Sequence, residues 1–548
     1  MELPRQNRVE RSDVMPRRIG LALSGGGFRA TLFHLGVVRL LNETGQLSQV
    51  KRIGAVSGGS ILAAHLVLHW EQYSGSNEDF DKAAQEIFRF VQKDIRGRVI
   101  RRWLLAWLCL AVPRLLKRHC LRWTRTNLLQ TQYGRLYKDK ALKDLRASDR
   151  PKVYFYCTSL TTGVLCSFGR SGFRWHKTYD DPQQRSIAAP NTPIAFAVAA
   201  SSAFPPLFPP IEISNKTLFS DRETFPYSHY LTDGGIYDNL GIDKLSWFQK
   251  TTPELDLFIA SDAQGHFDSE LDTRFKFIVG RNVRASDLLM TRVSSMQIER
   301  LTASQSPCFV RVGIKMEIDN PDDPTLLPPE SQRSLPKTRT DLDKFSATEI
   351  TALIAHGYSC ARKTLVEANV LTESAPAFSW DPLRNWQIVK SGNATRQLRQ
   401  SCIRRWRLWS SRDWVSYALL GLVLASLVCV GYLAYLPFKV AQVTQVIREV
   451  SAPRLIENIK VKEVTIPFDS MNVYQTESLT SVDRINVIFR NMTGQSAELY
   501  WIDLNGSAKL ITTIRSGSSA TVETFVGHLW EAKTLNGDTL GSYVVQGA

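Results

Sequence analysis

The chain has 548 residues, a net charge of +16 and an apolar share of 43%. This length predicts several domains, and this composition excludes a disordered or fibrous protein. The eight cysteines show no regular spacing and none lies beyond Cys429, so we expect neither a disulfide framework nor a zinc ribbon. Residues 437–548 hold 10 Lys and Arg against 11 Asp and Glu, so the positive charge lies earlier in the chain. It favours an anionic partner there, either membrane headgroups or nucleic acid.

The first 70 residues contain the most informative pattern. Residues 1–18 are charged and lack the apolar core of a secretory signal. A strand, a helix, a strand and a helix are then predicted, which indicates a parallel sheet in an α/β layer fold. Two turns of small residues join these strands to their helices, Ser24-Gly25-Gly26-Gly27 and Ser57-Gly58-Gly59-Ser60. Further buried strands are predicted at Lys152–Leu160 and Leu255–Ser261.

An unusual stretch, residues 96–125, separates these strands. Its centre, Trp103–Val112, is a run of ten apolar residues, which is too short to span a bilayer. Nine arginines and lysines flank this run. One interpretation is an interfacial anchor or lid, with tryptophans among lipid headgroups and arginines on lipid phosphates; the other is a buried core helix with solvated ends. The density of basic and aromatic residues favours the first.

A long helix closes the first part of the chain. Ser346-Ala-Thr-Glu349 is typical of a helix N-terminus and predicts a helix through about Glu367. Residues 374–392 are then expected to form a linker that leaves this domain.

Residues 414–436 form a run of 23 without a charge, followed by Pro437. The length and composition predict a transmembrane helix. Six arginines shortly precede the run, whereas only Lys439 and Arg448 follow it closely. The positive-inside rule therefore predicts that residues 1–413 are cytoplasmic and that residues 437–548 lie on the opposite, periplasmic or extracytoplasmic, side.

Short strands and turns dominate the end of the chain. Asn505-Gly506, Ser516-Gly517 and Asn536-Gly537 are typical hairpin turns. We expect a small all-β module of about 65 residues here. Its predicted strands are Arg484–Phe489, Glu498–Leu504, Lys509–Ile514, Thr521–Phe525 and Ser542–Val545.

Ser57 is the candidate nucleophile. It lies where a strand ends and a helix begins, with Ala55 two residues before it and Gly59 two residues after it. A nucleophile elbow needs small residues at these places, because the backbone folds tightly around the serine. The alternative is that Ser57 is an ordinary helix N-cap.

The glycines of the first turn fit an oxyanion hole. Gly25, Gly27 and Ala30 also match a dinucleotide fingerprint, but the next strand ends at Ser57 without the acidic residue that a ribose needs. Free backbone N–H groups close to a serine nucleophile would instead stabilise an oxyanion. The base stays open at this point: a histidine, His266 or His356, oriented by Asp233 or Asp262, or Asp233 acting directly.

Four blocks occur in order along the chain. They are Gly25-Gly26-Gly27-Phe28-Arg29-Ala30, Ala55-Val56-Ser57-Gly58-Gly59, Ala200-Ser201-Ser202-Ala203-Phe204-Pro205-Pro206 and Asp233-Gly234-Gly235. Together they resemble the signatures of patatin-like phospholipases, over about residues 18–365. The resemblance implies a patatin-like three-layer α/β fold with a mostly parallel sheet, followed here by the transmembrane helix and a small all-β sandwich.

The resemblance also implies roles for single residues. Ser57 would be the nucleophile and Asp233 the base of a Ser–Asp dyad without histidine, metal or cofactor. Gly25, Gly26 and Gly27 would donate to the oxyanion, and Arg29 would hold a substrate phosphate or the loop itself. The reaction would transfer an acyl group from a membrane phospholipid to the serine and release a fatty acid by hydrolysis.

The β module resembles a second family. Val487-Ile-Phe-Arg-Asn491, Trp501-Ile-Asp-Leu-Asn-Gly506 and Val526-Gly-His-Leu-Trp530 look like the β domain of the von Hippel–Lindau tumour suppressor. That domain binds a hydroxyproline-bearing peptide, which implies a peptide or protein ligand held by Thr524, His528 and Trp530. The alternative is that His528 and Trp530 are core residues of a small sandwich.

The hypothesis is therefore a membrane-anchored phospholipase. A competing hypothesis is a non-catalytic receptor or scaffold that binds a peptide or protein through its β domain. Nucleic-acid binding is suggested by charge alone, without any recognition motif, and we do not expect it. The predicted domains are residues 1–370, catalytic; 371–413, a basic linker; 414–436, the transmembrane helix; 437–480, a connector; and 481–548, the β domain.

Overall fold

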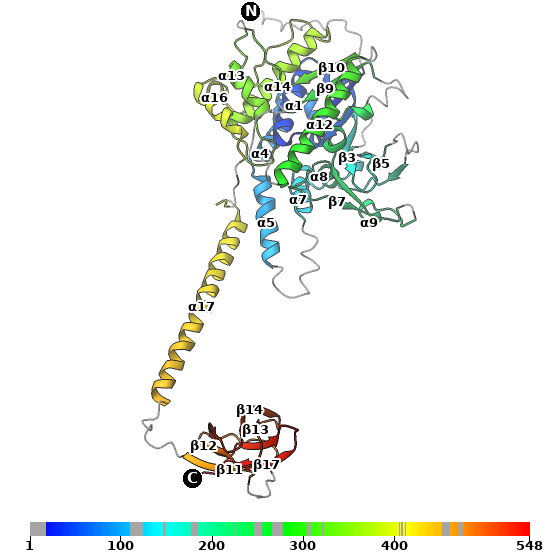
Figure 1. Cartoon of the computed structure of the whole chain (residues 1–548). Coiled ribbons are helices and arrows are strands. Elements are labelled where there is room, and N and C mark those ends of the chain that lie inside the picture. Colours follow the sequence, from blue (N-terminus) through cyan, green and yellow to red (C-terminus); the bar gives the residue numbers. More distant parts are fainter. Residues whose placement is uncertain are drawn as a thin grey trace, which may run out of the picture. The chain divides into compact units, whose positions relative to one another are not determined.

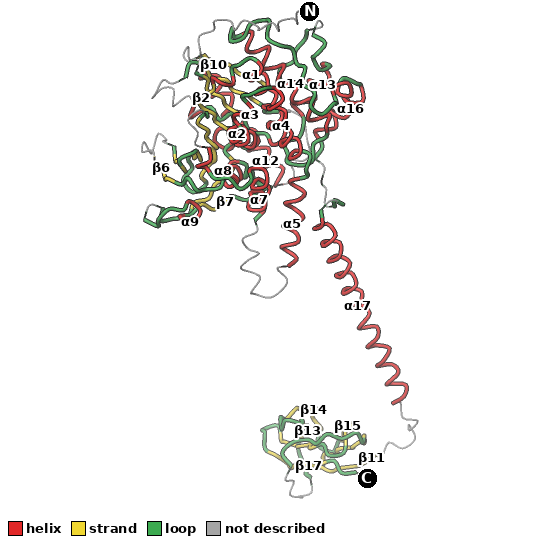
Figure 2. The backbone as a smooth tube through the Cα atoms, turned by 180° about the vertical axis from the view of Figure 1, so that it is seen from behind, coloured by secondary structure: helices red, strands yellow, loops and turns green. Residues whose placement is uncertain are grey.

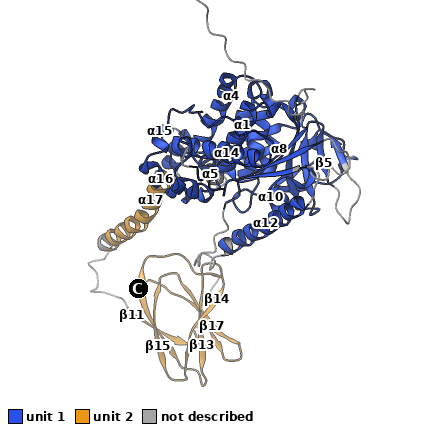
Figure 3. Ribbon diagram, turned by 90° about the horizontal axis from the view of Figure 1, so that it is seen from above, with its two compact units in different colours: residues 1–424 blue, residues 425–548 orange. Residues whose placement is uncertain are grey.

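The computed structural model describes most of the chain as two compact units, residues 1–424 and residues 425–548, each treated by itself (Figures 1 and 3). The described residues are 18–109, 124–145, 150–176, 185–223, 225–245, 255–265, 278–303, 308–320, 323–404, 406, 409–411, 413–451, 461–468 and 475–547.

A ten-stranded sheet forms the centre of the first unit. Five parallel strands lie side by side in the order β10 (Cys308–Gly313), β9 (Leu257–Asp262), β1 (Ile19–Leu23), β2 (Val50–Val56) and β3 (Lys152–Ser159). The sheet continues as an antiparallel meander of β4 (Leu165–Gly169), β5 (Gly172–Trp175) and β6 (Arg185–Ala188). The short β8 (His229–Asp233) pairs antiparallel with the end of β3, and β7 (Ile211–Ile213) pairs antiparallel with β8.

Helices cover both faces of this sheet (Figures 1 and 2). Alternate side chains of a strand point to opposite faces. Leu21 and Leu23 of β1 join the main core with α1 (Gly27–Glu43), α2 (Gly58–Leu68) and α14 (Ala347–Glu367). Ala22 joins a smaller core on the other face, against which Ile298 of α12 (Ile278–Thr302) packs. This three-layer arrangement with a mostly parallel sheet confirms the predicted fold class.

Two helices from opposite ends of the unit pack closely. An added Cβ at Gly36 of α1 would overlap the carbonyl of Ile354 in α14, and one at Gly357 would overlap the carbonyl of Phe33. The absent side chains let the two backbones approach. The predicted start of α14 is confirmed, because Ser346 and Glu349 form a capping box.

The remaining helices are shorter or lie at the periphery. They are α3 (Trp70–Tyr73), α4 (Asn77–Val91), α5 (Ile95–Cys109), α7 (Arg125–Tyr137), α8 (Ile194–Ser201), α9 (Asn215–Leu218), α10 (Gly235–Asp238), α13 (Pro329–Ser334), α15 (Trp386–Val389) and α16 (Gly392–Arg399). Within the described residues, 3₁₀ turns lie at Leu47–Gln49, Leu142–Leu145, Leu335–Lys337 and Gln400–Cys402.

The predicted linker before the long apolar helix is wrong. Trp380, Val389 and Leu398 are buried in the main core of the first unit, and α16 packs against α13. The segment is rich in polar residues, and only its sparse apolar side chains reach the core. The first unit therefore extends well past residue 370.

The basic and aromatic stretch forms α5 over its first part, and residues 110–123 lie outside the described residues. Arg96 is fully buried and forms an ion pair with Asp341, and Arg101 pairs with Asp94 and Asp413. These two arginines neutralise buried carboxylates, so the interpretation that places them on lipid phosphates is wrong.

A single long apolar helix follows, α17 (Trp414–Ser451). Residues Trp414–Arg448 are long and apolar enough to cross a membrane. Their most apolar stretch has a mean hydropathy of 2.3, and none of it is buried. The helix continues past Pro437, where the prediction ended it. Proline removes one backbone hydrogen bond from a helix but does not force it to stop.

The second unit is a small β sandwich. One sheet has the order β11 (Val461–Ile466), β12 (Arg484–Asn491) and β15 (Ser519–Phe525). The other has the order β14 (Ala508–Ile514), β13 (Ala497–Ile502), β16 (Leu529–Thr534) and β17 (Thr539–Val544). Val487, Phe489, Leu499 and Trp530 are buried in the core. This confirms the predicted sandwich.

Two of its strands were not predicted. The sequence pattern assigned residues 437–480 to a connector, but β11 lies within them, pairs in parallel with β12 and buries Ile466. β16 was also missed, although it pairs with both β13 and β17.

Candidate active site

Ser57 lies in a strained turn between β2 and α2. Its backbone has a φ of 50° and a ψ of −117°, and a serine in such a sparsely populated region stores about 1–3 kcal/mol of strain. Its side chain makes no capping hydrogen bond, so the N-cap interpretation is wrong. The conformation is that of a nucleophile elbow.

The third sequence block holds this elbow in place. The backbone N–H of Ser57 donates to Ser201 Oγ at 3.0 Å, and the hydroxyls of Ser201 and Ser60 lie 2.9 Å apart. Ser201 is the last residue of α8 and is fully buried. Sequence reasoning recognised the block but assigned no role to this serine.

The two glycine turns pack backbone against backbone. An added Cβ at Gly58 would overlap the carbonyl oxygen of Gly27, and one at Gly59 would overlap that of Leu23. The hydroxyl of Thr31 donates to the carbonyl of Gly58 at 2.7 Å and ties α1 to the elbow. The first turn therefore lies directly beside the serine, as an oxyanion hole requires.

Two of the three predicted oxyanion donors have backbone N–H groups that are free to bind an oxyanion. Gly26 has a φ of 140° and Gly27 one of 57°, and no acceptor for either N–H group lies among the described residues. The N–H of Gly25 instead donates to the carbonyl of Asn239 at 3.0 Å. This hydrogen bond removes Gly25 from the expected set of donors, because its N–H is already satisfied.

Asp233 ends β8, and its backbone is fixed on both sides. Its N–H donates to the carbonyl of Ala203 at 3.2 Å, and its own carbonyl accepts from the Thr158 hydroxyl at 3.0 Å. The residue is opposite Cys157 of β3 in the antiparallel pair. The local fold therefore holds this carboxylate rigidly at the edge of the parallel strands.

The two oxygens of Asp233 differ in their surroundings. Oδ1 accepts from the N–H of Gly235 at 2.7 Å, whereas Oδ2 is buried and accepts no well-formed hydrogen bond from the described residues. Burial raises the pKa of Asp233 to about 7, against the smaller opposing effects of the Gly235 N–H and the Ser57 side chain. The structure thus brings Asp233 and Ser57 together.

The histidine alternatives receive no support from the described residues. His356 is buried in α14, where its Nε2 lies 2.8 Å from the carbonyl oxygen of Ile314, and burial lowers its pKa to about 4. Asp262, one of its candidate orienting residues, accepts two hydrogen bonds from Arg311. His266 lies outside the described residues.

Arg29 holds loops. Its Nε donates to the carbonyl of Ala263 at 3.1 Å, and its Nη1 donates to those of Thr338 and Pro336 at 2.7 and 3.2 Å. Burial lowers its pKa to about 10. Of its two predicted roles, these contacts fit loop stabilisation, and they leave a phosphate-binding role without support.

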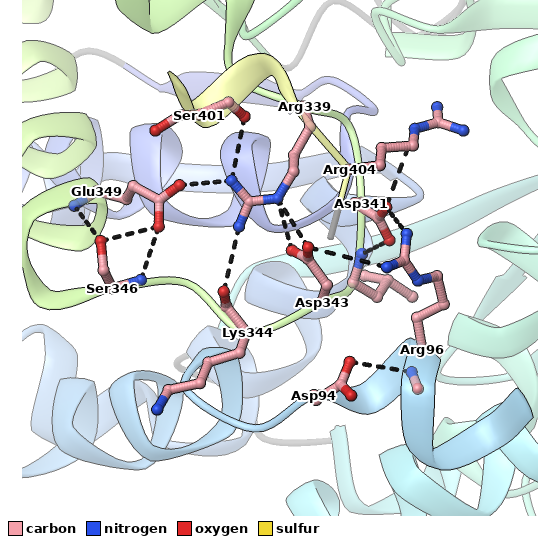
Figure 4. Close-up of polar contacts among 12 residues, drawn as sticks. Asp94, Arg96, Arg339, Asp341, Asp343, Lys344, Ser346, Glu349, Ser401 and Arg404 are labelled. Carbon is pink, nitrogen blue, oxygen red and sulfur yellow. Dashed lines mark hydrogen bonds and ion pairs between the residues drawn. The ribbon is translucent and has the colours of Figure 1, made fainter. Parts of the chain in front are cut away.

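A buried network of ion pairs (Figure 4) packs against the glycine turn. The N–H of Phe28 donates to the carbonyl of Asp341 at 3.0 Å, and the backbone of Asp341 packs against Gly27. The Asp341 carboxylate forms an ion pair with Arg96. Arg339 binds Asp343 at 2.7 Å and Glu349 at 2.5 Å. Sequence reasoning missed this support, since Arg96 and the glycine turn lie far in the chain from residues 339–349.

The predicted ligand-binding residues of the second unit lie together. Thr524 Oγ1 lies 3.0 Å from His528 Nδ1 and accepts from Trp530 Nε1 at 3.2 Å. Trp530 is buried against Phe489, and His528 stacks on Trp501. The three side chains therefore satisfy one another, which fits the core interpretation for Trp530.

Comparison with family models identifies both regions. Residues 21–245 match the patatin-like phospholipase family, and residues 476–540 match the VHL beta domain. The first unit therefore contains a region similar to the patatin-like phospholipases. A comparison with curated proteins found no match.

Several solved structures show a low similarity to this chain. The human GIVD cytosolic phospholipase A2 is 13% identical, with a TM-score of 0.39 over 70% of this chain and 60% of that chain. Its complex with methyl gamma-linolenyl fluorophosphonate is 12% identical, with a TM-score of 0.37 over 70% of this chain and 59% of that chain. VipD from Legionella pneumophila is 14% identical, with a TM-score of 0.27 over 70% of this chain and 75% of that chain. The chain thus spans about 60% of the length of the human enzyme.

Proposed function

We propose that the chain is a membrane-anchored serine acyl hydrolase that cleaves fatty acyl esters of phospholipids. The patatin-like domain supports the lipid ester class. The observation that carries the proposal is the strained Ser57 beside a buried carboxylate, Asp233, whose Oδ2 is unpaired among the described residues and whose pKa is raised to about 7. A general base is most effective when its pKa lies near the working pH.

In the proposed first step, Asp233 Oδ2 takes the proton of the Ser57 hydroxyl as Oγ attacks the ester carbonyl. The tetrahedral oxyanion accepts hydrogen bonds from the N–H groups of Gly26 and Gly27, and each is expected to contribute about 3–4 kcal/mol to the transition state. The protonated Asp233 then gives its proton to the leaving lysophospholipid oxygen, and the acyl group stays on Ser57.

In the second step, a water molecule replaces the leaving group. Asp233 takes one proton from this water as its oxygen attacks the acyl carbonyl, and the same two glycines hold the second oxyanion. The C–O bond to Ser57 breaks, the serine regains a proton from Asp233, and a fatty acid leaves. The dyad needs no other base in either step.

Membrane anchoring is the second part of the proposal. Helix α17 is long and apolar enough to cross a bilayer, and the arginines before it favour a cytoplasmic catalytic unit. A tether holds an enzyme at a high local concentration of its lipid substrate. Alkaline carbonate extraction tests it: the full chain should stay in the membrane, and a Leu424→Arg/Val428→Arg variant should be released.

The catalytic proposal is tested by fatty acid release from defined phospholipids. Ser57→Ala and Asp233→Asn should each lower the rate about 10³-fold or more, since the members of a catalytic unit act together. His356→Gln and His266→Ala should retain activity. A folded Ser57→Ala or Asp233→Asn variant with unchanged hydrolysis would overturn the dyad, and an inactive, folded histidine variant would favour the triad alternative.

A further inference from the structure

Residues of helices α4, α5 and α7 and of the turns beside them line a pocket of about 230 Å³ in the first unit. Glu86 is its acidic lining residue. Its basic lining residues are Arg89, Lys93, Arg98, Arg135 and Lys138. Basic side chains from three separate segments therefore lie around one concave site.

This positive charge is largely uncompensated. Glu86 is already engaged, since Lys138 Nζ lies 3.0 Å from one of its oxygens and His65 Nε2 lies 3.3 Å from the other. Among the described residues, no carboxylate lies within ion-pair distance of the other four basic side chains. Burial lowers the pKa of Lys93, and the charges of Arg98, Arg135 and Arg89 lower it further.

A buried polar group in the pocket lacks a partner. Gln132 of α7 lines the pocket and is 2% exposed, and its Nε2 has no hydrogen-bond acceptor among the described residues. An unpaired buried donor is costly and calls for an explanation. An anion in the pocket would accept this hydrogen bond and neutralise the surrounding charge at the same time.

A metal ion is the weaker explanation of this region. The ligand atoms of His65, His69 and Glu86 lie within 4.8 Å of one another, on the edge of the pocket. However, the Lys138 ammonium group is bonded to the same Glu86 and would repel a cation. The excess of guanidinium and ammonium groups selects a negatively charged ligand instead.

We propose that this pocket binds a phosphate monoester, as a second site distinct from Ser57 and Asp233. Such a group carries about −1.5 to −2 charges and three strong acceptor oxygens. Arginine guanidinium groups bind such oxygens in pairs, and the amide of Gln132 supplies a neutral donor. The site goes beyond the proposed catalytic function and does not depend on it.

The phosphate can belong to a lipid headgroup or to a soluble metabolite. Arg98 lies one turn before Arg101 and Arg102 on α5, and both of these bind Asp413, directly before α17. If α17 spans a membrane, the pocket lies close to the bilayer surface, which favours a headgroup such as that of phosphatidic acid.

Binding is measured on the full chain, with Ser57→Ala in every variant so that hydrolysis does not consume the ligand. One arm measures calorimetric binding of glycerol 3-phosphate to protein in phosphatidylcholine nanodiscs. The other measures phosphatidic acid retained after purification from mixed micelles with phosphatidylcholine. The pocket variant is Lys93→Gln/Arg135→Gln, and the control is Lys51→Gln/Lys216→Gln, which removes the same charge from exposed positions elsewhere.

The pocket variant should weaken binding about tenfold or more, because charge-assisted hydrogen bonds to phosphate are lost. The control should stay within about twofold, since neither of its residues lines the pocket. Gln132→Leu should also weaken binding without a change in charge and without loss of thermal stability. Weaker binding by the pocket variant in both arms, or in the lipid arm alone, supports the site. An effect in the lipid arm alone identifies a lipid headgroup as the source of the phosphate. No binding to the parent chain, or an equal loss in pocket and control variants, overturns it.

Discussion

The two units place their chemically important polar groups in opposite situations. In the first unit, one oxygen of Asp233 is buried and unpaired among the described residues, beside a serine in a strained backbone conformation. In the second unit, Thr524, His528 and Trp530 bind one another. The cluster in the first unit therefore carries a free-energy cost, whereas the polar groups of the cluster in the second unit satisfy one another.

This difference separates the proposed reactive site from a structural cluster. Unpaired buried groups and strained backbones persist only where the surrounding fold enforces them, and they concentrate at functional sites. Around Asp233, the enforcing elements are β3, β8 and the glycine turns with their ionic support. The C-terminal cluster needs no such enforcement, so a ligand there would first have to displace an internal hydrogen bond of Thr524.

The largest expected effect is on the ionic support of the first unit. Arg339→Met leaves the buried Glu349 without its ion-pair partner and the buried Asp343 with Arg96 alone, at 3.9 Å, and this should cost about 3–5 kcal/mol of unfolding free energy. Hydrogen exchange measured by mass spectrometry should show the loss in the first unit and not in the β sandwich. The control Arg333→Met removes an exposed ion pair with Glu317 and should cost less than about 1 kcal/mol.

Asp233→Asn should stabilise the first unit while it abolishes hydrolysis. The folded pKa of about 7 lies above the ordinary value of 3.8, so between these two pH values the native state keeps a proton that the unfolded chain releases. The resulting loss of stability grows from about pH 4 to pH 7 and is complete above pH 7. Removing the charge should therefore raise the unfolding free energy by roughly 2–4 kcal/mol at pH 8. Chemical unfolding of the two proteins at pH 5 and pH 8 measures this.

Asp238→Asn is the matched contrast. This carboxylate is also buried, but its two oxygens accept from the N–H groups of Gly241 and Asp243 at 2.9 and 2.8 Å. An amide would lose one of these hydrogen bonds, but it would also remove the penalty of ionising a carboxyl whose pKa burial raises to about 6, so the variant should be stabilised less than Asp233→Asn. A similar stability change in both variants would contradict the distinction between the two carboxylates.

The pH profile should report the same unpaired carboxylate. The base must be ionised, so kcat/KM should fall toward tenfold per pH unit well below 7, or about fiftyfold between pH 7 and pH 5. Initial rates on a soluble short-chain ester, measured with the folded state monitored by circular dichroism, provide the test. A flat profile over this range would mean that the working base has a lower pKa than Asp233.

The smallest expected effect lies in the second unit. Thr524→Val keeps the shape of the side chain but leaves His528 and the indole of Trp530 without their partner, and it should cost about 1–2 kcal/mol. Thermal unfolding of the sandwich measures this, with the exposed Thr513→Val as a control expected within about 0.5 kcal/mol. An unchanged stability would indicate that the cluster is not structural.

Local patterns predicted much of the fold. Strand and helix periodicity located β1, α1, β2 and α2, and the capping box located the start of α14, because these signals arise within a few neighbouring residues. β11 and the packed segment after residue 370 were missed. Each is stabilised by partners that lie elsewhere in the chain.

The sequence by itself determined the candidate groups of the active site: two glycine turns, Ser57 and Asp233. Only small residues permit such turns, and this constraint is visible in the chain. The tertiary structure decided which groups are free, since the N–H of Gly25 is taken by Asn239 and the guanidinium of Arg29 by loop carbonyls. Hydrogen-bond satisfaction and burial depend on residues that are distant in sequence, so only the folded chain reveals that Asp233 keeps an unpaired oxygen beside Ser57.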